Sequence, residues 1–262
     1  MGESTGTRPS MRTRREPPPF RQVAVAGVEN PTPRVVRVIL DGPELGDLIV
    51  AEPAASVRLL LPSPGASEVV IPIWNGNEFL LPGGQRPTIR TFTPIRGPGS
   101  NSELALDIVA HGSGAASDWA TAAVVGVRAA VSGPGRGYLS DPDASSFLLI
   151  GDETAVPAIS QLVAALPSGR AQRIGIEVAS PEAIRTLPDR AEALVEWCVL
   201  PDGALPGEAQ FDYVRTVDLG PGVRIWAAGE AAAMQRIRRH LFDERGVDRS
   251  NTMIRGYWKR TT

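Results

Sequence analysis

The amino-acid sequence predicts two domains, an antiparallel β-barrel followed by an α/β domain built on a parallel sheet. Its 262 residues exceed the usual domain size of about 100 to 200 residues. Up to about Ala130, short β-type runs are separated by Pro and Gly, which is typical of antiparallel barrels and sandwiches. From residue 146 to residue 258, strand patterns alternate with helix patterns, which is typical of a parallel sheet covered by helices.

The first half contains a series of candidate strands and one candidate helix. The candidate strands are short, rich in β-branched residues and bounded by Pro or Gly. They cover residues 21–28, 34–40, 57–61, 88–94 and 103–109. Residues 115–124 are rich in alanine, and we expect them to form a short helix. The pattern changes after a segment rich in Gly and Pro, residues 132–137.

The second half alternates strands with helices. The candidate strands are residues 146–150, 172–178, 194–200, 224–228 and 252–258. The candidate helices are residues 155–166, 181–187 and 231–245. In the last helix, Met234, Ile237 and Leu241 recur at helical spacing, so we expect this stripe to be buried. The predicted domains therefore cover residues 20–135 and 146–262.

The composition is that of an ordinary soluble globular protein. Hydrophobic residues make up 42% of the chain and charged residues 21%, and the net charge is -2. This balance creates no overall basic field, so no nucleic-acid partner is expected. The chain contains no apolar run of about 18 residues, so no membrane association is expected. Arg14-Arg15 leads into Glu16-Pro17 and not into an apolar segment, which indicates a cytoplasmic protein.

Two further features bear on order and on redox chemistry. Residues 1–19 are polar and rich in arginine, and they are expected to form a disordered tail. The single cysteine, Cys198, lies in an apolar run and is expected to pack as a small buried hydrophobe. One cysteine alone cannot form an intrachain disulfide, a thiolate zinc site or an iron–sulfur cluster.

The stretch with the strongest functional signal is Arg90-Thr91-Phe92-Thr93. Alternate side chains of a strand share a face, so Arg90 and Phe92 point one way while Thr91 and Thr93 point the other. A guanidinium group binds phosphate through paired hydrogen bonds, and an aromatic ring stacks on a π surface. This pair therefore suits a ligand in which an anionic group is joined to a flat aromatic system, as in a flavin nucleotide.

A glycine-rich turn, His111-Gly112-Ser113-Gly114, follows the next candidate strand and leads into the short helix. Glycine lets the backbone approach a ligand closely, and the N–H groups of a helix N-terminus favour an anion, so a pyrophosphate would fit here. Taken alone, the match fits an ordinary strand-to-helix turn better. Its position shortly after Arg90 to Thr93 favours the ligand site.

The two histidines limit the available chemistry. His111 could donate a proton, but beside glycines a positioning or hydrogen-bonding role is the better interpretation. His240 lies in an arginine-rich helix and is expected to be exposed to solvent. Two histidines provide no His-rich metal site and few candidates for a Ser-His-Asp triad, so hydrolase chemistry is not expected.

A second possible ligand site follows the first strand of the α/β half. Asp152 to Thr154 can cap the next helix, and Pro157 suits its first turn, so a well-formed helix start is one interpretation. The other is a ligand at the carboxyl ends of the strands, where open α/β sheets usually bind. Gly229-Glu230 has the equivalent position later in the chain. Neither segment is a Gly-x-Gly-x-x-Gly fingerprint, so a nicotinamide nucleotide would bind only transiently.

Together, these motifs resemble the siderophore-interacting proteins, the FAD-dependent ferric-siderophore reductases of the ferredoxin-reductase-like superfamily. The resemblance covers about residues 20 to 258 and keeps the family order. The matching segments are Arg90-Thr91-Phe92-Thr93, residues 107–109 with His111-Gly112, Ala116-Ser117 with Trp119-Ala120, Gly133-Pro134 with Arg136-Gly137, residues 151–154 with residues 157–159, residues 228–231 and Gly256-Tyr257-Trp258.

The resemblance implies a six-stranded antiparallel flavin-binding barrel followed by an α/β nicotinamide-binding domain. It implies that Arg90 holds the FAD phosphate, that Phe92 stacks on the flavin, and that Thr91 and Thr93 bond the flavin or its ribityl chain. It also implies that His111 and the turn at residues 115–117 contact the phosphates and the adenosine. The full set of implied cofactor-binding residues is Arg90, Thr91, Phe92, Thr93, Asp107, Val109, His111, Ala115, Ala116, Ser117, Asp152, Glu153 and Thr154.

The resemblance further implies a ferric siderophore as substrate and NAD(P)H or a reduced ferredoxin as electron donor. No residue is assigned a direct catalytic role, because the flavin carries the redox chemistry. No protein-bound metal is needed, and a monomer is expected. The candidate substrate-binding cations are Arg58, Arg136 and Arg255, with Lys259 in reserve, and a solvated surface cation is an equally good interpretation of each.

Two departures from the family pattern concern the cofactor. Phe92 stands where tyrosine is usual, which keeps the stacking but removes a hydroxyl group, and Ala115 replaces a proline. Two other functions remain open: a flavin reductase that acts on ferredoxin, free flavin or a biosynthetic intermediate, and a flavin- or siderophore-binding protein without turnover.

Overall fold

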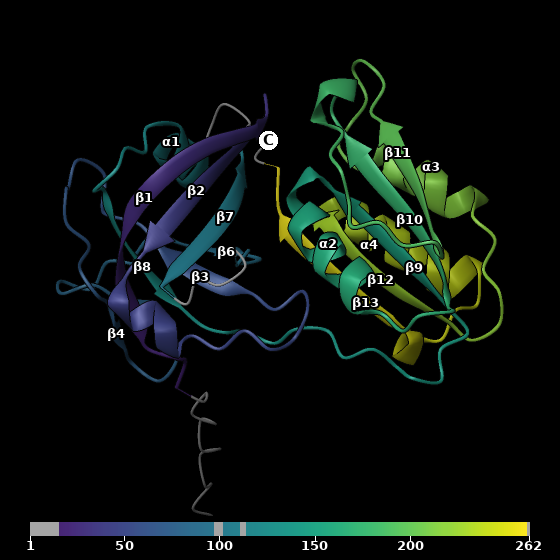
Figure 1. Ribbon diagram of the computed structural model, residues 1–262, viewed down its shortest axis with the longest axis horizontal. Coiled ribbons are helices and arrows are strands. Elements are labelled where there is room, and N and C mark those ends of the chain that lie inside the picture. Colours follow the sequence, from purple (N-terminus) through teal and green to yellow (C-terminus); the bar gives the residue numbers. More distant parts are fainter. Residues whose placement is uncertain (1–15, 97–101, 111–113, 261–262) are drawn as a thin grey trace, which may run out of the picture.

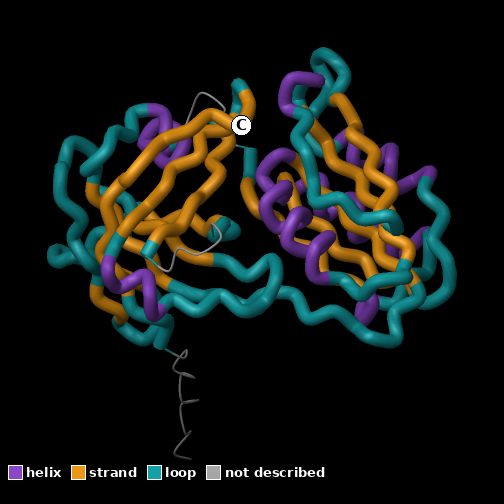
Figure 2. Tube along the Cα trace, in the orientation of Figure 1, coloured by secondary structure: helices purple, strands orange, loops and turns teal. Residues whose placement is uncertain are grey.

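The computed structural model describes residues 16–96, 102–110 and 114–260. Its elements form two units side by side, one built mainly of strands and one of strands covered by helices (Figures 1 and 2). The first has a 6-stranded antiparallel sheet in the order β6-β3-β8-β1-β2-β7, and the second has a 5-stranded parallel sheet in the order β11-β10-β9-β12-β13. The predicted fold class is confirmed. Among the described residues, no helix is both long and apolar enough to cross a membrane.

The antiparallel sheet curls around an apolar core. Alternation explains this, because Val23 and Val25 on β1 and Val38 and Leu40 on β2 point inward and are almost completely buried. The segment directly after the edge strand β6 meets the other edge strand, β7, through an isolated bridge between Ile95 and Ala105, with two N–H to O distances of 2.8 Å. The strands are β1 (Phe20–Thr32), β2 (Val35–Asp41), β3 (Val57–Leu60), β6 (Ile89–Phe92), β7 (Glu103–Val109) and β8 (Arg128–Ser132).

Smaller elements complete the barrel. The helix α1 (Ala115–Thr121) packs Ala116, Trp119 and Ala120 against the barrel core. It therefore covers one end of the barrel (Figure 1). The connection between β3 and β6 contains a small hairpin of β4 (Ile73–Trp74) and β5 (Phe79–Leu80), and one 3-10 turn, η1 (Pro43–Asp47), follows β2.

The parallel sheet has a helix layer on each face. Helix α2 packs on one face with Phe147, Leu149 and Trp226, while α3 and α4 pack on the other with Leu148 and Ile225. Both faces of the strands are thus apolar, as parallel sheets require. The elements are β9 (Ser146–Asp152), α2 (Val156–Ala165), β10 (Ala171–Val178), β11 (Ala193–Val199), α3 (Glu208–Thr216), β12 (Val223–Glu230), α4 (Ala231–Arg239) and β13 (Thr252–Trp258). The turns are η2 (Glu153–Ala155), η3 (Pro181–Ala183), η4 (His240–Glu244) and η5 (Arg249–Asn251).

Some local predictions were wrong. The helix expected at residues 181–187 is only the turn η3, because the chain beyond Ala183 crosses to the barrel. Helix α3 was not predicted, and neither was strand β8. The strand candidates of both halves and the helix candidates at residues 155–166 and 231–245 are confirmed within a few residues, and Met234, Ile237 and Leu241 are buried as expected.

His240 is the clearest error in predicted exposure. Its side chain is buried, and it lies in η4, a π-helical turn that follows α4. His240 comes three residues after the buried Ile237, and the ring of Phe211 on α3 covers it edge-on at 5.6 Å. Its Nδ1 lies 2.7 Å from Glu244 Oε2. Cys198 is only half-buried, because β11 is the edge strand of its sheet.

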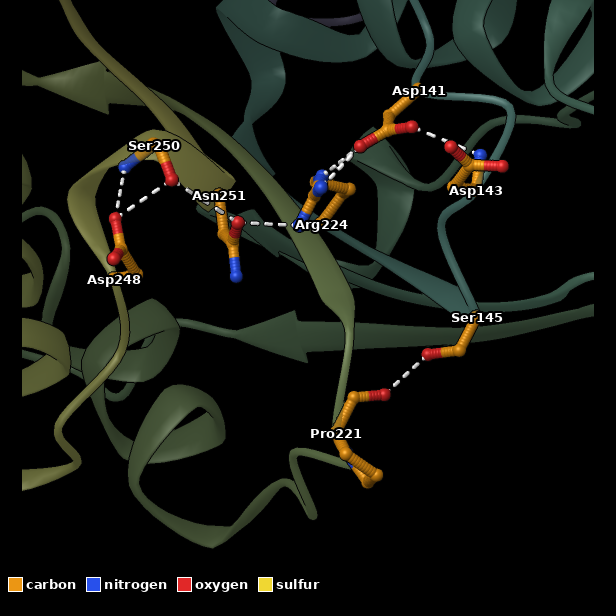
Figure 3. Close-up of polar contacts among 8 residues, drawn as sticks. All are labelled: Asp141, Asp143, Ser145, Pro221, Arg224, Asp248, Ser250 and Asn251. Carbon is orange, nitrogen blue, oxygen red and sulfur yellow. Dashed lines mark hydrogen bonds and ion pairs between the residues drawn. The ribbon is translucent and has the colours of Figure 1, made fainter.

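The linker between the two units is tied to the α/β domain (Figure 3). Arg224 at the start of β12 bonds the carboxylate of Asp141 and the side chain of Asn251. Ser145 Oγ donates to the carbonyl oxygen of Pro221 at 2.5 Å. Hydrogen bonds with the backbone N–H of Asp143 and with Arg224 lower the pKa of Asp141, which keeps this half-buried carboxylate ionised. These contacts hold the amino-terminal edge of the parallel sheet, opposite the edge that carries Asp152.

Candidate functional site

Strand β6 presents the predicted pair of cation and ring. Arg90 lies opposite Leu59 and Phe92 opposite Val57, so both share the face of β3 that turns toward the barrel core, whereas Thr91 lies opposite Arg58. The predicted alternation is confirmed for Arg90, Thr91 and Phe92, whereas Thr93 lies after the last paired residue of the strand. Arg90 is exposed. Among the described residues, its side chain makes one hydrogen bond, from Nη1 to the carbonyl oxygen of the neighbouring Ile89 at 2.9 Å. Phe92 is half-buried against the barrel core.

The end of β6 is held by the α/β domain. Thr93 is only 6% exposed, and its hydroxyl shares a hydrogen bond with the hydroxyl of Tyr257 on β13. Gln161 on α2 donates from Nε2 to the carbonyl oxygen of Pro94 at 2.7 Å and accepts the N–H of Ala54 at 2.9 Å. The strand that carries Arg90 to Thr93 therefore ends at the interface between the two domains.

A groove of about 820 Å³ runs beside the start of the same strand. Thr88, two residues before Arg90, lies on one wall, and Ala115, Asp118 and Trp119 of α1 lie on another. The remaining lining comes from residues 61–68 and 125–128. The indole N–H of Trp119 is buried without a hydrogen-bond partner among the described residues. The groove thus offers partly apolar walls, and one of its lining residues has a buried donor without a partner, a combination that suits a nucleoside.

The residues predicted around the phosphate turn divide into two groups. His111 lies outside the described residues. Of the residues that follow, Ala115 lines the groove, whereas Ala116 packs into the barrel core and the side chain of Ser117 is buried. Only backbone groups of Ala116 and Ser117 can therefore meet a ligand. The turn enters α1 through Gly114, whose φ of 107° is readily adopted only by glycine.

Asp107 and Val109 lie on β7. The carboxylate of Asp107 accepts hydrogen bonds from Arg37 at 2.7 and 3.0 Å and from Arg185 of the α/β domain at 2.6 Å. Its side chain is 2% exposed, and its hydrogen bond raises the pKa of Arg37. Asp107 therefore joins the domains through its carboxylate. Val109 pairs with Val35 at the end of β7.

Asp152, Glu153 and Thr154 occupy the carboxyl end of β9. Asp152 caps the following turn by accepting the N–H of Thr154 at 2.9 Å, and it also accepts Trp258 Nε1 at 2.7 Å. Burial raises the pKa of Asp152. Glu153 accepts Arg34 Nε of the barrel at 3.1 Å and the N–H of Ala179 at 2.9 Å. Both carboxylates thus bond protein groups, at the point between β9 and β12 where the strand order reverses.

The structure brings two of the predicted substrate cations together. Arg255 Nη1 on β13 donates to the carbonyl oxygen of Arg136, in the segment after β8, at 3.4 Å. Arg136 is exposed and Arg255 is half-buried, so this contact brings a cation of β13 next to the segment that carries Arg136. Arg58 lies on β3 opposite Thr91, and Lys259 is exposed just beyond β13.

Comparison with known proteins identifies the family. Residues 24–138 match the siderophore-interacting FAD-binding domain, and residues 144–261 match the model named siderophore-interacting protein. The chain belongs to the siderophore-interacting protein family. A siderophore utilization protein from T. fusca has 32% sequence identity and a TM-score of 0.81, over 94% of this chain and 96% of its own.

Two relatives of this siderophore-interacting protein carry functional names. Ferric vibriobactin reductase ViuB of Vibrio cholerae is 26% identical over 229 residues, which is 86% of this chain and 84% of the relative. The NADPH-dependent ferric-chelate reductase of Escherichia coli is 26% identical over 247 residues, which is 91% of this chain and 92% of the relative.

The barrel is the FAD-binding domain of this siderophore-interacting protein, and its residues fit that cofactor. Arg90 is exposed on β6, the end of β6 reaches the α/β domain, and the groove with the unpartnered Trp119 N–H lies at the other end of the strand. An exposed guanidinium group can bind phosphate, an interface between domains can take a flavin ring, and a groove of this kind can take an adenosine.

Sequence reasoning missed the residues that join the two domains. Tyr257 and Gln161 hold the end of β6, while Arg34 and Arg185 each bind a carboxylate of the opposite domain. The motif Gly256-Tyr257-Trp258 was the one signal in the sequence for these residues, and no role was assigned to it. The partners of Arg34 and Arg185 lie 119 and 78 residues away in the sequence, so no local pattern reveals them.

Proposed function

We propose that this protein is an FAD-dependent reductase of ferric siderophores that works in the cytoplasm as a monomer. Its electrons would come from NAD(P)H or from a reduced carrier such as ferredoxin. The relatives named ferric vibriobactin reductase and NADPH-dependent ferric-chelate reductase support this activity. The two domains proposed for these tasks are residues 20–135 for FAD and residues 146–262 for the nicotinamide nucleotide.

One juxtaposition carries the proposal: Thr93, directly after β6, meets β13 close to two arginines, the exposed Arg136 and the half-buried Arg255. Thr93 bonds Tyr257, and two residues earlier on β13 Arg255 bonds the backbone of Arg136. One interface therefore combines three features: side chains that suit a flavin, an adjoining α/β domain, and positive charge that suits an anionic chelate. Attraction between this charge and the chelate would orient the chelate toward the flavin.

The proposed cofactor contacts follow from where the side chains lie. Arg90 binds the phosphate, Phe92 lies against the ring system, and Thr91 and Thr93 supply hydroxyl groups. FAD, when bound, accepts a hydride and can pass on its electrons one at a time. Trp119 bonds the adenosine half in the groove, a role that we add to the predicted set. The carboxylates of Asp107, Asp152 and Glu153 would affect the site indirectly, because they already accept hydrogen bonds from other side chains of the protein.

The iron is a substrate and is brought by the chelate. Hard oxygen donors hold ferric iron more tightly than ferrous iron, so reduction loosens the complex and releases the metal. Arg58, Arg136 and Arg255, with Lys259, would attract the negative charge of the chelate.

An anaerobic titration tests the proposal. The purified protein should be yellow, bleach when NADH or NADPH is added, and recolour when a ferric siderophore is added with a ferrous trap that develops its own colour. A protein that purifies colourless and takes up no FAD contradicts the proposal. Flavin that is reduced without ferrous iron being formed indicates a different flavin reductase, and flavin that no donor reduces indicates a binding protein.

A further inference from the structure

Strand β13 has a β-bulge at Tyr257. It pairs with β12 in regular parallel register from Ile225 and Thr252 up to Gly229 and Gly256, but the next pair joins Glu230 to Trp258. Tyr257 is therefore an extra residue without a partner on β12. A bulge of this kind redirects the side chain of the extra residue, and bulges recur beside functional sites.

The redirected side chain leaves its own sheet and reaches the barrel. The Tyr257 hydroxyl shares a hydrogen bond with the hydroxyl of Thr93, the residue directly after β6. Its ring packs edge-on against Trp226, with the ring centres 6.2 Å apart and the planes at 84°. The ring of Tyr257 is thus held by the core of the α/β domain, while its hydroxyl bonds Thr93 at the end of β6 in the barrel.

The next residue secures the same segment from the other side. Trp258 donates its indole N–H to Asp152 Oδ2 at 2.7 Å, and Asp152 caps the turn after β9. Two consecutive side chains of β13 therefore have different partners: Tyr257 contacts Thr93 of the barrel, and Trp258 contacts Asp152 at the end of β9. This double attachment limits the freedom of Tyr257 to move away from Thr93.

We propose that Tyr257 is a positioning residue for the flavin: by bonding the Thr93 hydroxyl, it sets how that hydroxyl is presented to the bound cofactor. The inference rests on the proposed function and adds a residue of the nicotinamide domain to the flavin site. Burial raises the pKa of Tyr257, so the phenol is neutral and can act toward Thr93 as a donor as well as an acceptor. A threonine hydroxyl that accepts this bond still has its own proton to donate to a ligand.

The test compares three hydroxyl deletions in the full-length protein. Tyr257→Phe and Thr93→Val each remove one side of the bond, and Tyr213→Phe is the matched control. Tyr213 also has a raised pKa, but its ring packs over Gly175 inside the α/β domain. The measurements are the Kd of FAD, from titration of the apoprotein by flavin fluorescence, and the midpoint potential of the bound flavin.

We expect Tyr257→Phe to weaken FAD binding by about three- to tenfold, the usual effect of losing one hydrogen bond. We also expect it to change the relative affinity for oxidised and reduced flavin by up to about tenfold, which equals about 30 mV for a two-electron couple. Tyr213→Phe should leave both values unchanged. Because the two hydroxyls act together, the Kd of FAD for the double variant Tyr257→Phe with Thr93→Val should match that of Thr93→Val alone within about twofold. Thr93→Ser, which keeps the hydroxyl, should have the midpoint potential of the wild type.

Three results would overturn the inference. One is a wild-type Kd and potential in Tyr257→Phe. Another is a lowered unfolding temperature with an unchanged potential, because that would make Tyr257 a structural residue only. The third is full additivity of Tyr257→Phe and Thr93→Val. Failure of the wild-type protein to take up FAD would overturn both the inference and the proposed function, whereas failure to reduce siderophores would overturn only the latter, since neither measurement uses a substrate.

Discussion

Arg34, in the turn between β1 and β2, donates its Nε–H to both carboxylate oxygens of Glu153, at 3.1 Å each, across the domain interface. The Glu153 side chain is 8% exposed, and its other bond is with the N–H of Ala179. Asp107 and Arg185 form a second ion pair across the same interface. The orientation of the two domains therefore depends on carboxylates that are shielded from water.

Removing the Arg34 side chain should destabilise the protein by about 1–3 kcal/mol, because the buried Glu153 loses its charged partner. The matched control is Arg86→Ala, which breaks the 2.6 Å pair with Glu78 on the surface, where the arginine side chain is 80% exposed. That change should cost less than about 1 kcal/mol. Urea unfolding of both variants measures the difference. Equal losses would mean that the Arg34 pair contributes no more than a surface ion pair.

Replacing Arg90 with alanine should weaken FAD binding about 10- to 100-fold, the range expected for a charge-assisted hydrogen bond to phosphate. Arg90 is exposed, so the free energy of unfolding of the apoprotein should change by less than about 0.5 kcal/mol. Arg215→Ala, an exposed arginine on α3, is the control. Flavin titration of the three proteins checks the prediction, and wild-type affinity in Arg90→Ala would remove the role assigned to this residue.

The double variant Arg136→Ala with Arg255→Ala should raise the KM for an anionic ferric siderophore about tenfold, because two cations that attract the chelate are lost. Flavin reduction by NAD(P)H should proceed as in the wild type. The difference in KM should shrink as the salt concentration rises, since ions screen exposed charges. Steady-state kinetics with a neutral chelate serve as the control, and an equal rise in KM for that chelate would point to damaged packing rather than lost charge.

Cys198 should react slowly with thiol reagents despite being only half-buried. Burial raises the pKa of its thiol to about 11, with a further contribution from Glu196. At pH 8, its thiolate fraction is then more than about 100-fold smaller than that of an unperturbed cysteine. Labelling with a chromogenic disulfide should therefore accelerate with pH up to about 11, whereas urea-unfolded protein should level off near pH 9. A plateau near pH 9 in the folded protein would contradict the raised pKa.

Much of the fold was predictable from local patterns. The alternation of Val23 and Val25 predicts a half-buried strand, and the spacing of Met234, Ile237 and Leu241 predicts a helix with one buried face. Errors occurred where a distant element decides the environment. Phe211 of the unpredicted helix α3 covers His240, and the chain after Ala183 extends to the barrel because Arg185 bonds Asp107.

The candidate site likewise combines features that local sequence patterns predict with contacts that depend on distant residues. By itself, the sequence determined the two-domain architecture and the strand that carries Arg90 and Phe92, because period, turn residues and a short motif are local properties of the chain. Only the tertiary structure decided that Asp107 and Glu153 join the domains, that Arg136 meets Arg255, and that Tyr257 reaches Thr93. These contacts join residues far apart in the chain, and their geometry depends on how two separately formed sheets pack together.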